Sequence, residues 1–251
     1  MTEKILILDF GSQYTQLIAR AVREANIYCE IIPFHKAFTI DPTLKGIILS
    51  GSPFSVNEDN APSVDIASFI AQLPVLGVCY GAQLTAKVFG GKVDKSNKRE
   101  YGRAQLDIQQ QDQLFSGIST KSQVWMSHSD TVTKLPEGFH VTAKTASIDV
   151  AAYASDAGRF EFPVYCIQFH PEVTHSDQGK TILENFVVKI CGCKQSWTPE
   201  SFVEETIAYI KNTVQNDKVV LGLSGGVDSS VAAILLNKAI GSNLISIFVN
   251  N

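Results

Sequence analysis

The sequence of 251 residues lacks any hydrophobic run long enough to span a membrane, and it has no strong excess of charge of either sign. A spanning helix needs about 20 consecutive apolar residues. The apolar run ILILDF near the N-terminus is also too short for the core of a signal peptide, and no small-residue cleavage site follows it. The formal net charge of −4 gives no electrostatic basis for binding nucleic acid or an anionic membrane surface. We therefore expect small molecules as partners.

Cysteines are scarce, and their number is odd. The five are Cys29, Cys79, Cys166, Cys191 and Cys193. Scattered cysteines in odd number argue against a disulfide framework and favour a reducing compartment, the cytoplasm. Cys191 and Cys193 lack further ligands at zinc-finger spacing, so no metal site is expected there.

Short apolar runs alternate with helical stretches over the first third of the chain. Residues 5–10, 46–51 and 74–81 predict strands, and residues 15–25 and 66–73 predict helices. Runs that are apolar on both faces suit a parallel sheet covered by helices on each side. We therefore expect an α/β fold with a doubly wound, mostly parallel, flavodoxin-like sheet.

The pattern changes between about residue 92 and residue 170, where strands such as AQLDIQ, HVTAKTAS and PVYCIQFH alternate with polar turns. We expect an antiparallel extension that returns to the sheet at residues 164–170. A helix is predicted from about Gln178 to Ile190.

A polar break, CGCKQSWTPES, follows that helix, with Thr198 as a helix cap and Pro199 at the first helical position. We place a domain boundary here, between residues 1–196 and residues 197–251. The second segment has helix, strand, glycine-rich turn, helix and strand. Two parallel strands and their helices cannot cover both faces of a sheet, so this segment is expected to be the beginning of an α/β domain.

The segment PVLGVCYGAQL places Cys79 between a predicted strand and a helix, with Gly77 and Gly81 two positions to either side. This is the nucleophile-elbow spacing with cysteine in place of serine, because small flanking residues permit a sharp turn that projects the side chain. The thiol would also lie near a helix N-terminus, whose partial positive charge favours the thiolate. A buried core cysteine is the alternative for this residue taken alone.

His170 and Glu172 flank Pro171 directly after a predicted buried strand. In extended backbone, residues two apart point to the same side, and the proline favours that geometry. The carboxylate can then orient the imidazole while the other ring nitrogen takes the thiol proton, as in a Cys-His-acid triad. Either residue alone would be an ordinary strand-end side chain, but with Cys79 they predict a catalytic site.

A turn at Gly51, Ser52 and Pro53 ends the predicted strand GIILSG. The backbone N–H groups of Gly51 and of Tyr80, the residue after the nucleophile, could bind a tetrahedral oxyanion. Taken alone, the segment is only a strand-ending turn.

Together, the GVCYG elbow, the HPE segment at His170 to Glu172 and the glycine turn resemble the class I (triad) glutamine amidotransferases over about residues 4 to 190. The resemblance implies that Cys79 attacks the side-chain amide of glutamine, forms a γ-glutamyl thioester and releases ammonia without a cofactor. It implies that His170 shuttles protons and that Glu172 orients His170.

The resemblance also bears on two other positions. It implies that Gln83 helps to hold the substrate glutamine. The family usually has Gly-Gly-Pro where this chain has Gly-Ser-Pro, so Ser52 would be strained if its position needs a positive φ.

The other histidines are weaker candidates. His128 lies in VWMSHSD beside two serines and Asp130, yet no serine of the chain lies in a GxSxG elbow. We expect His128 to be a loop residue near the site or the interdomain contact. The histidines without a partner pattern are expected to be structural or solvated, namely His35, His140 and His175.

The string SGGVDSS follows the predicted strand KVVLGL and precedes a helix. Glycines let the backbone approach a phosphate closely, and a helix start offers N–H groups and a dipole to an anion. No lysine follows the glycines, so this is not a Walker A loop. A glycine turn with an Asp or Ser cap would also suit such a joint.

The full string resembles the PP-loop of ATP pyrophosphatases, which cleave ATP between its α- and β-phosphates. The resemblance implies that Asp228 assists a magnesium ion or caps the helix. The implied ATP-binding residues are Ser224, Gly225, Gly226, Val227, Asp228, Ser229 and Ser230.

The two segments together resemble the glutamine-dependent enzymes that aminate xanthosine monophosphate to GMP. The resemblance implies that ammonia released at Cys79 displaces AMP from adenylated xanthosine monophosphate, that the complete enzyme uses ATP and Mg²⁺, and that it is a homodimer. This chain alone would be the glutaminase half. Residues that bind xanthosine monophosphate would lie beyond Asn251.

Three alternatives remain open. An amidotransferase subunit could serve another acceptor, as in anthranilate or carbamoyl phosphate synthesis, although the PP-loop argues against it. A non-catalytic regulatory domain would carry a triad that is not assembled, and the departure at Ser52 leaves this open. A peptidase of similar fold would cleave amides without selectivity for free glutamine.

Overall fold

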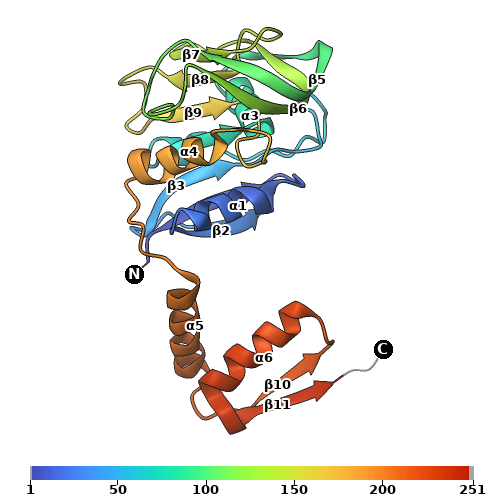
Figure 1. The fold of residues 1–251 in the computed structure, drawn as a ribbon, viewed down its shortest axis with the longest axis vertical. Helices are drawn as coiled ribbons and strands as arrows, with labels where there is room; N and C mark the ends of the chain where they lie inside the picture. The colour runs from blue at the N-terminus through green and yellow to red at the C-terminus, as the bar shows by residue number, and fades with distance from the viewer. Residues whose placement is uncertain (1, 249–251) are drawn as a thin grey trace. The chain divides into compact units, whose positions relative to one another are not determined.

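The structure is a computed structural model that describes residues 2–248, except for the side chains of residues 96–100 (Figure 1). The chain divides into two compact units, residues 1–196 and residues 197–251. Met1 and residues 249–251, the outer ends of the two predicted domains, lie outside the described residues.

In the described part of the first unit, nine strands form one mixed sheet in the order β2-β1-β3-β4-β9-β8-β7-β5-β6. Its strands are β1 (Lys4–Asp9), β2 (Tyr28–Pro33), β3 (Leu44–Leu49), β4 (Val75–Val78), β5 (Lys92–Ile108), β6 (Lys121–Lys134), β7 (Phe139–Lys144), β8 (Ala152–Ser155) and β9 (Val164–Ile167).

The predicted fold class is confirmed, including the antiparallel extension. Strands β2, β1, β3, β4 and β9 pair in parallel, whereas β8, β7, β5 and β6 continue the sheet in antiparallel fashion. The chain returns at β9, which pairs with β4 in parallel and with β8 in antiparallel register. The extension therefore supplies the antiparallel half of a mixed sheet.

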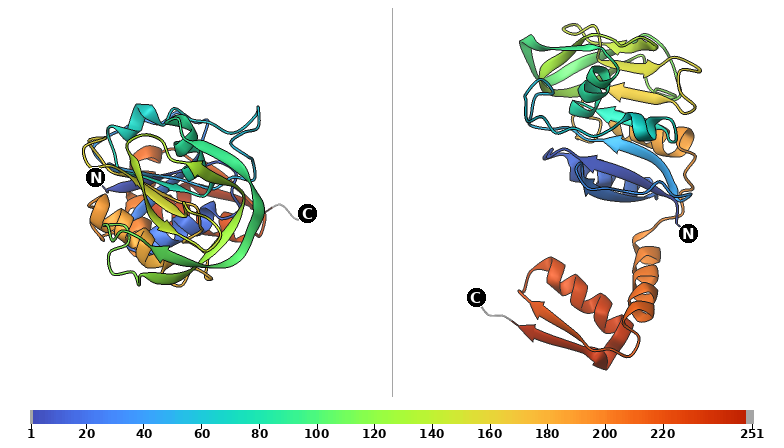
Figure 2. Two further views of the ribbon diagram at one scale, coloured as in Figure 1. Left: turned by 90° about the horizontal axis from the view of Figure 1, so that it is seen from above. Right: turned by 180° about the vertical axis from the view of Figure 1, so that it is seen from behind.

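Alternation along the buried strands builds a core on each face of the sheet. In β1, Ile5 and Ile7 pack on one face with residues of α1 (Thr15–Glu24) and α4 (Gly179–Glu184). Leu6 and Leu8 pack on the other face with α2 (Ala67–Ile70) and α3 (Tyr80–Val88). Figure 1 shows α1 and α4 in front of the sheet, and the view from behind in Figure 2 shows the opposite layer. A π-helical segment, Asn185–Ile190, continues α4.

The second unit contains α5 (Pro199–Val214), β10 (Val219–Leu223), α6 (Val227–Ile240), a 3-10 turn (Gly241–Asn243) and β11 (Leu244–Phe248). Strands β10 and β11 pair in parallel. The predicted start of α5 is present, since the Thr198 side chain accepts a hydrogen bond from the Ser201 backbone N–H and Pro199 follows the cap. Among the described residues of this unit, only Ala239 is buried.

No helix in the described range combines the length and apolarity needed to cross a membrane.

Candidate active site

Cys79 lies at the turn between β4 and α3, with φ of +52° and ψ of −102°. A residue with a side chain rarely adopts positive φ, and such strain is concentrated at functional sites. The Cys79 backbone N–H donates a hydrogen bond of 2.8 Å to the Ile167 carbonyl oxygen, so that β9 holds the turn in place. The backbone therefore has the sharp strand-to-helix turn that the glycine spacing predicts.

The two glycines beside Cys79 are required by close packing. A Cβ atom at Gly77 would lie 2.8 Å from the Ala82 backbone nitrogen. At Gly81 it would lie 2.5 Å from the Leu49 carbonyl oxygen. Neither distance is available to a real side chain, so the glycines let α3 approach β3 and β4.

His170 follows β9, and its backbone is fixed from two sides. Its N–H donates a hydrogen bond of 2.9 Å to the Trp125 carbonyl oxygen in β6, and the Ser176 hydroxyl donates to its carbonyl oxygen. The His170 Nδ1 lies 2.7 Å from the Glu172 Oε1, and the two side chains are 4% and 1% exposed. The carboxylate therefore acts on the imidazole with little screening by water.

The charge state of His170 results from opposing influences. Burial lowers the pKa of His170, whereas the Glu172 carboxylate and the Cys79 sulfur raise it, and together they hold the pKa well above its usual value. A protonated imidazole beside Cys79 stabilises a thiolate, which is the nucleophilic form of cysteine. The three side chains can therefore support a thiolate–imidazolium pair.

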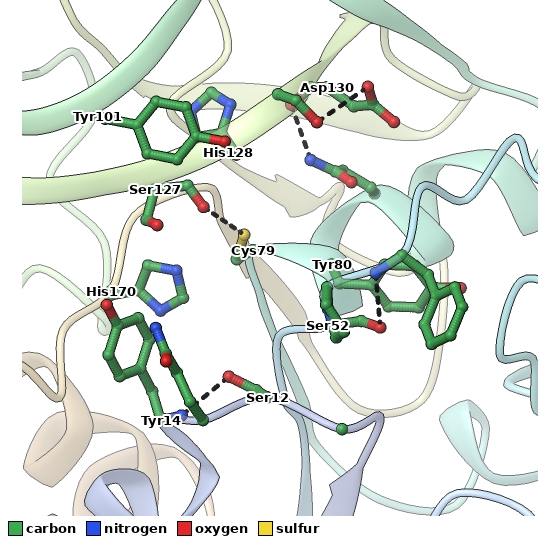
Figure 3. Close-up of a pocket in the computed structure, with 16 residues that line it drawn as sticks. Ser12, Tyr14, Ser52, Cys79, Tyr80, Tyr101, Ser127, His128, Asp130 and His170 are labelled. Atoms are coloured by element: carbon green, nitrogen blue, oxygen red, sulfur yellow. Dashed lines mark hydrogen bonds between the residues drawn. The ribbon is translucent and has the colours of Figure 1, made fainter.

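A cavity of about 410 Å³ opens onto Cys79 (Figure 3). Four segments and Tyr101 supply most of its lining: residues 11–14 after β1, residues 52–54, the elbow with α3, and residues 127–130 of β6. In the view of Figure 3, Ser127 and His170 lie on one side of Cys79, and Ser52 and Tyr80 lie on the other. A small molecule can therefore reach the Cys79 sulfur through this cavity.

The other predicted residues lie at or beside this cavity. Tyr80 and Gln83 line it, and the Gln83 Nε2 donates a hydrogen bond of 2.8 Å to the Asp130 carbonyl oxygen. As the first residue of α3, Tyr80 has a backbone N–H without an intrahelical acceptor. Gly51 borders the site, since a Cβ atom there would lie 3.4 Å from the His170 Cε1. Glu172 contacts His170 but does not line the cavity.

Ser52 does not have the strained backbone that a positive φ would impose. Within residues 2–248, the non-glycine residues of positive φ are Asn26, Cys79 and Gln215, and Ser52 is not one of them. Its hydroxyl accepts a hydrogen bond of 3.2 Å from the Phe54 backbone N–H. A serine is therefore compatible with this turn.

His128 lines the cavity, but the expectation that it is a loop residue is wrong. It lies within β6, where buried and half-exposed residues alternate along nearly the whole strand. Burial lowers the pKa of His128 to about 4. The imidazole is therefore neutral at pH 7.

Tyr14 and Gln168 lie at the site but are not predicted from the sequence. The ring of Tyr14 lies edge-on to that of His170, with 4.9 Å between the ring centres. The Gln168 Nε2 lies 3.9 Å from the Cys79 Sγ. The spacing of two between Gln168 and His170 was a usable signal, because such residues share one side of an extended chain. Nothing in the sequence pointed to Tyr14.

In the second unit, the string SGGVDSS forms the turn between β10 and α6. Gly225 has φ of +80°, and Gly226 is the N-cap residue of α6. The hydroxyls of Ser224 and Ser229 lie 3.2 Å apart, and the Ser230 hydroxyl donates to the Gly226 carbonyl oxygen. The helix start is exposed, so its N–H groups and dipole are available to an anion.

Two family models match the chain. The model of class-I glutamine amidotransferases matches residues 6–190, and the model of NAD synthase matches residues 201–249.

Curated relatives match the whole chain. The glutamine-hydrolysing GMP synthase of Cytophaga hutchinsonii is 60% identical over 100% of this chain and 49% of its own length. GMP synthase 1 of Bacteroides thetaiotaomicron is 55% identical with the same coverage. The resemblance predicted from the motifs is thereby confirmed. The chain spans about half the length of the curated relatives that it matches.

Solved structures share the fold of the first unit. A Thermoplasma acidophilum protein described as a GMP synthase subunit has a TM-score of 0.67 and 31% identity, covering 76% of this chain and 95% of that one. A glutamine amidotransferase from Thermotoga maritima has a TM-score of 0.60 at 16% identity, covering 76% of this chain and 99% of that one, and shows the fold alone.

Proposed function

This chain belongs to the class-I glutamine amidotransferase family, and we propose that its Cys79, His170 and Glu172 hydrolyse the side-chain amide of free glutamine to glutamate and ammonia. The observation that carries the proposal is the buried His170–Glu172 pair beside a cysteine at a strained elbow. This arrangement favours the chemistry of a Cys-His-acid triad.

The first half of the reaction forms a thioester. The Cys79 thiolate attacks the amide carbon, and the negative charge moves to the amide oxygen. The backbone N–H groups of Tyr80 and Gly51 stabilise this oxyanion, and Gln83 helps to hold the glutamine. His170 gives its proton to the amide nitrogen, the carbon–nitrogen bond breaks and ammonia leaves.

The second half restores the enzyme. His170 takes a proton from a water molecule, which attacks the thioester carbon. The carbon–sulfur bond breaks, glutamate leaves and gives up its γ-carboxyl proton to solvent, and the Cys79 thiolate remains beside the reprotonated His170. Glu172 orients the imidazole and stabilises its charged form in both halves.

The second unit supports a role in ATP use. We propose that Ser224, Gly225, Gly226 and Ser229 cradle the pyrophosphate of ATP at the start of α6, with the flanking residues Val227, Asp228 and Ser230. The match to the NAD synthase model over residues 201–249 and the exposed helix start favour this.

Asp228 is the loop residue that could assist a magnesium ion at this site. Within the described residues there is no group of three or more His, Cys, Asp or Glu side chains that could hold a metal ion. Asp228 therefore offers a single carboxylate, and the ion would be held chiefly by phosphate oxygens, as is common for Mg²⁺. It would neutralise phosphate charge during adenylation.

For the complete enzyme, we propose that the ammonia aminates adenylated xanthosine monophosphate to GMP, that the enzyme is a homodimer, and that it works in the cytoplasm. The identity of 55% or more to glutamine-hydrolysing GMP synthases over the whole chain favours this acceptor over those of other amidotransferases.

The test is release of ammonia and glutamate from glutamine by the purified chain. We expect release from the wild type and none from Cys79→Ala. Cys29→Ala, which changes a buried core cysteine, is the matched control and should retain activity. Equal release by wild type and Cys79→Ala would refute the triad.

A further inference from the structure

Gln168 lies next to the nucleophile and has no part in the triad. It follows β9 directly, and its Nε2 lies 3.9 Å from the Cys79 Sγ. The residue is 2% exposed, so water does not compete for its amide group. Its amide is thus a buried polar neighbour of the reacting sulfur.

The neighbours of the sulfur favour different protonation states. The Ser127 carbonyl oxygen, 3.9 Å away, accepts a hydrogen bond from the thiol and so favours the neutral form. The Gln168 amide is a donor, and a donor favours the charged form. Once the proton has moved to His170, the hydrogen bond to Ser127 is lost and the contact with Gln168 becomes stronger, because it is then made to a charge.

Packing alone does not explain a glutamine here. Within the described residues, the Gln168 Oε1 is buried without a hydrogen-bond partner. A buried polar group without a hydrogen-bond partner is destabilising. The backbone N–H of Gln168 already donates to the Ala151 carbonyl oxygen, so the side chain is not needed to hold the strand end. An apolar side chain of similar size would fill the space at lower cost.

We propose that Gln168 stabilises the Cys79 thiolate by donating an amide N–H to the sulfur, and that it thereby sets the pH range in which the nucleophile is reactive. The inference rests on the proposed function, because it takes Cys79 as the nucleophile.

The test measures the alkylation rate of Cys79 by iodoacetamide as a function of pH, with peptide mass spectrometry to assign the cysteine. Gln168→Met keeps the size of the side chain and removes the donor. Because a hydrogen bond to a charged group is stronger than one to a neutral group, the midpoint of the profile should rise by about one pH unit or more, and the rate at pH values below both midpoints should fall about tenfold. Gln168→Glu should raise the midpoint further, because its charge opposes the thiolate.

Gln109→Met, which changes an exposed glutamine, is the matched control and should keep the wild-type profile. The thermal unfolding midpoint of Gln168→Met should be equal to or above that of the wild type, because the unsatisfied oxygen is gone. A purely structural role would lower that midpoint and leave the pH profile unchanged.

The experiment distinguishes failure of the role proposed for Gln168 from failure of the function proposed for Cys79. An unchanged midpoint in Gln168→Met overturns the inference and leaves the proposed function standing. If Gln168→Met does not fold, the profile of Gln168→Leu, which also removes the donor without adding a charge, decides in the same way. A wild-type Cys79 that reacts no faster near neutral pH than the other cysteines contradicts the proposed function itself.

Discussion

Burial gives the contact between Glu172 and His170 its strength. Both side chains are almost fully shielded from solvent, so the carboxylate raises the pKa of the imidazole against the effect of burial. His140 and Asp156 form a similar pair at 2.7 Å, but they lie outside the Cys79 cavity and are partly exposed. We therefore expect the histidine–carboxylate pair to be catalytic at His170 and ordinary at His140, because the surroundings of the two pairs differ.

Glu172→Gln should lower kcat for glutamine hydrolysis by about 10²–10⁴-fold, the range expected when the orienting acid of a triad is neutralised. The variant keeps the size of the side chain and removes the charge that raises the pKa of His170, so the imidazolium should be lost at a lower pH. Steady-state rates across the neutral pH range measure both effects. Asp156→Asn is the control, and a Glu172→Gln rate close to that of the control would contradict the assigned role.

His128 should make the first unit less stable in mild acid. Its pKa falls from 6.5 to about 4 on folding, chiefly because of burial, so the unfolded chain binds a proton that the folded chain does not. The free energy of unfolding should therefore decrease by about 3 kcal/mol as the pH falls from 6.5 to about 4. Urea unfolding should show a smaller loss over this window in His128→Gln. His175→Gln, which removes an exposed imidazole, is the control and should lose as much stability as the wild type. A loss in His128→Gln equal to that of the wild type, or a smaller loss in His175→Gln as well, would contradict the role of His128.

At the scale of elements, local patterns predicted the elbow and the strand-to-helix order because their causes are local. The glycines around Cys79 encode the close approach of α3 to β3 and β4. By contrast, β2 was missed, since YCEIIP at an outer strand mixes a charge with apolar residues. The serines and His128 of β6 suggested a loop, although their alternation marks a strand with one buried face.

Gly81→Ala should destabilise the first unit by about 1–3 kcal/mol and abolish glutamine hydrolysis. The added Cβ would lie 2.5 Å from the Leu49 carbonyl oxygen, so α3 would have to move and carry the elbow with it. Urea unfolding followed by circular dichroism measures the loss. Gly222→Ala is the control, because a Cβ atom there meets nothing within 4 Å. Equal stabilities of the two variants would show that the close packing is not needed.

At the scale of the whole molecule, the site is assembled from segments that are remote in the sequence. Residues 11–14, 52–54 and 127–130 meet around Cys79 and His170. Spacing within one segment could predict the Cys79 elbow and the His170–Glu172 pair, because both are local. It could not bring Tyr14 to the edge of His170, because that contact depends on the order of strands in the sheet.

The two units differ in how much they bury, and their protection from hydrogen exchange should differ accordingly. Strands β1, β3, β4 and β9 contact the hydrophobic core on both faces of the sheet, whereas every residue of β10 and β11 is exposed or half-exposed. Amides of the first set should exchange at least about tenfold more slowly, because opening the second unit exposes little apolar surface. Exchange followed by mass spectrometry at peptide level measures this. Equal protection would show that the second unit has a buried core in solution.

The most direct test of the account is covalent trapping of Cys79 by a glutamine analogue that carries an electrophile in place of the amide. Intact-mass and peptide mapping should show one adduct per chain, located on Cys79, prevented by excess glutamine and absent from Cys79→Ala. Absence of an adduct on Cys79, or labelling spread over the five cysteines that glutamine does not prevent, would contradict the claim that this cavity is a glutaminase site.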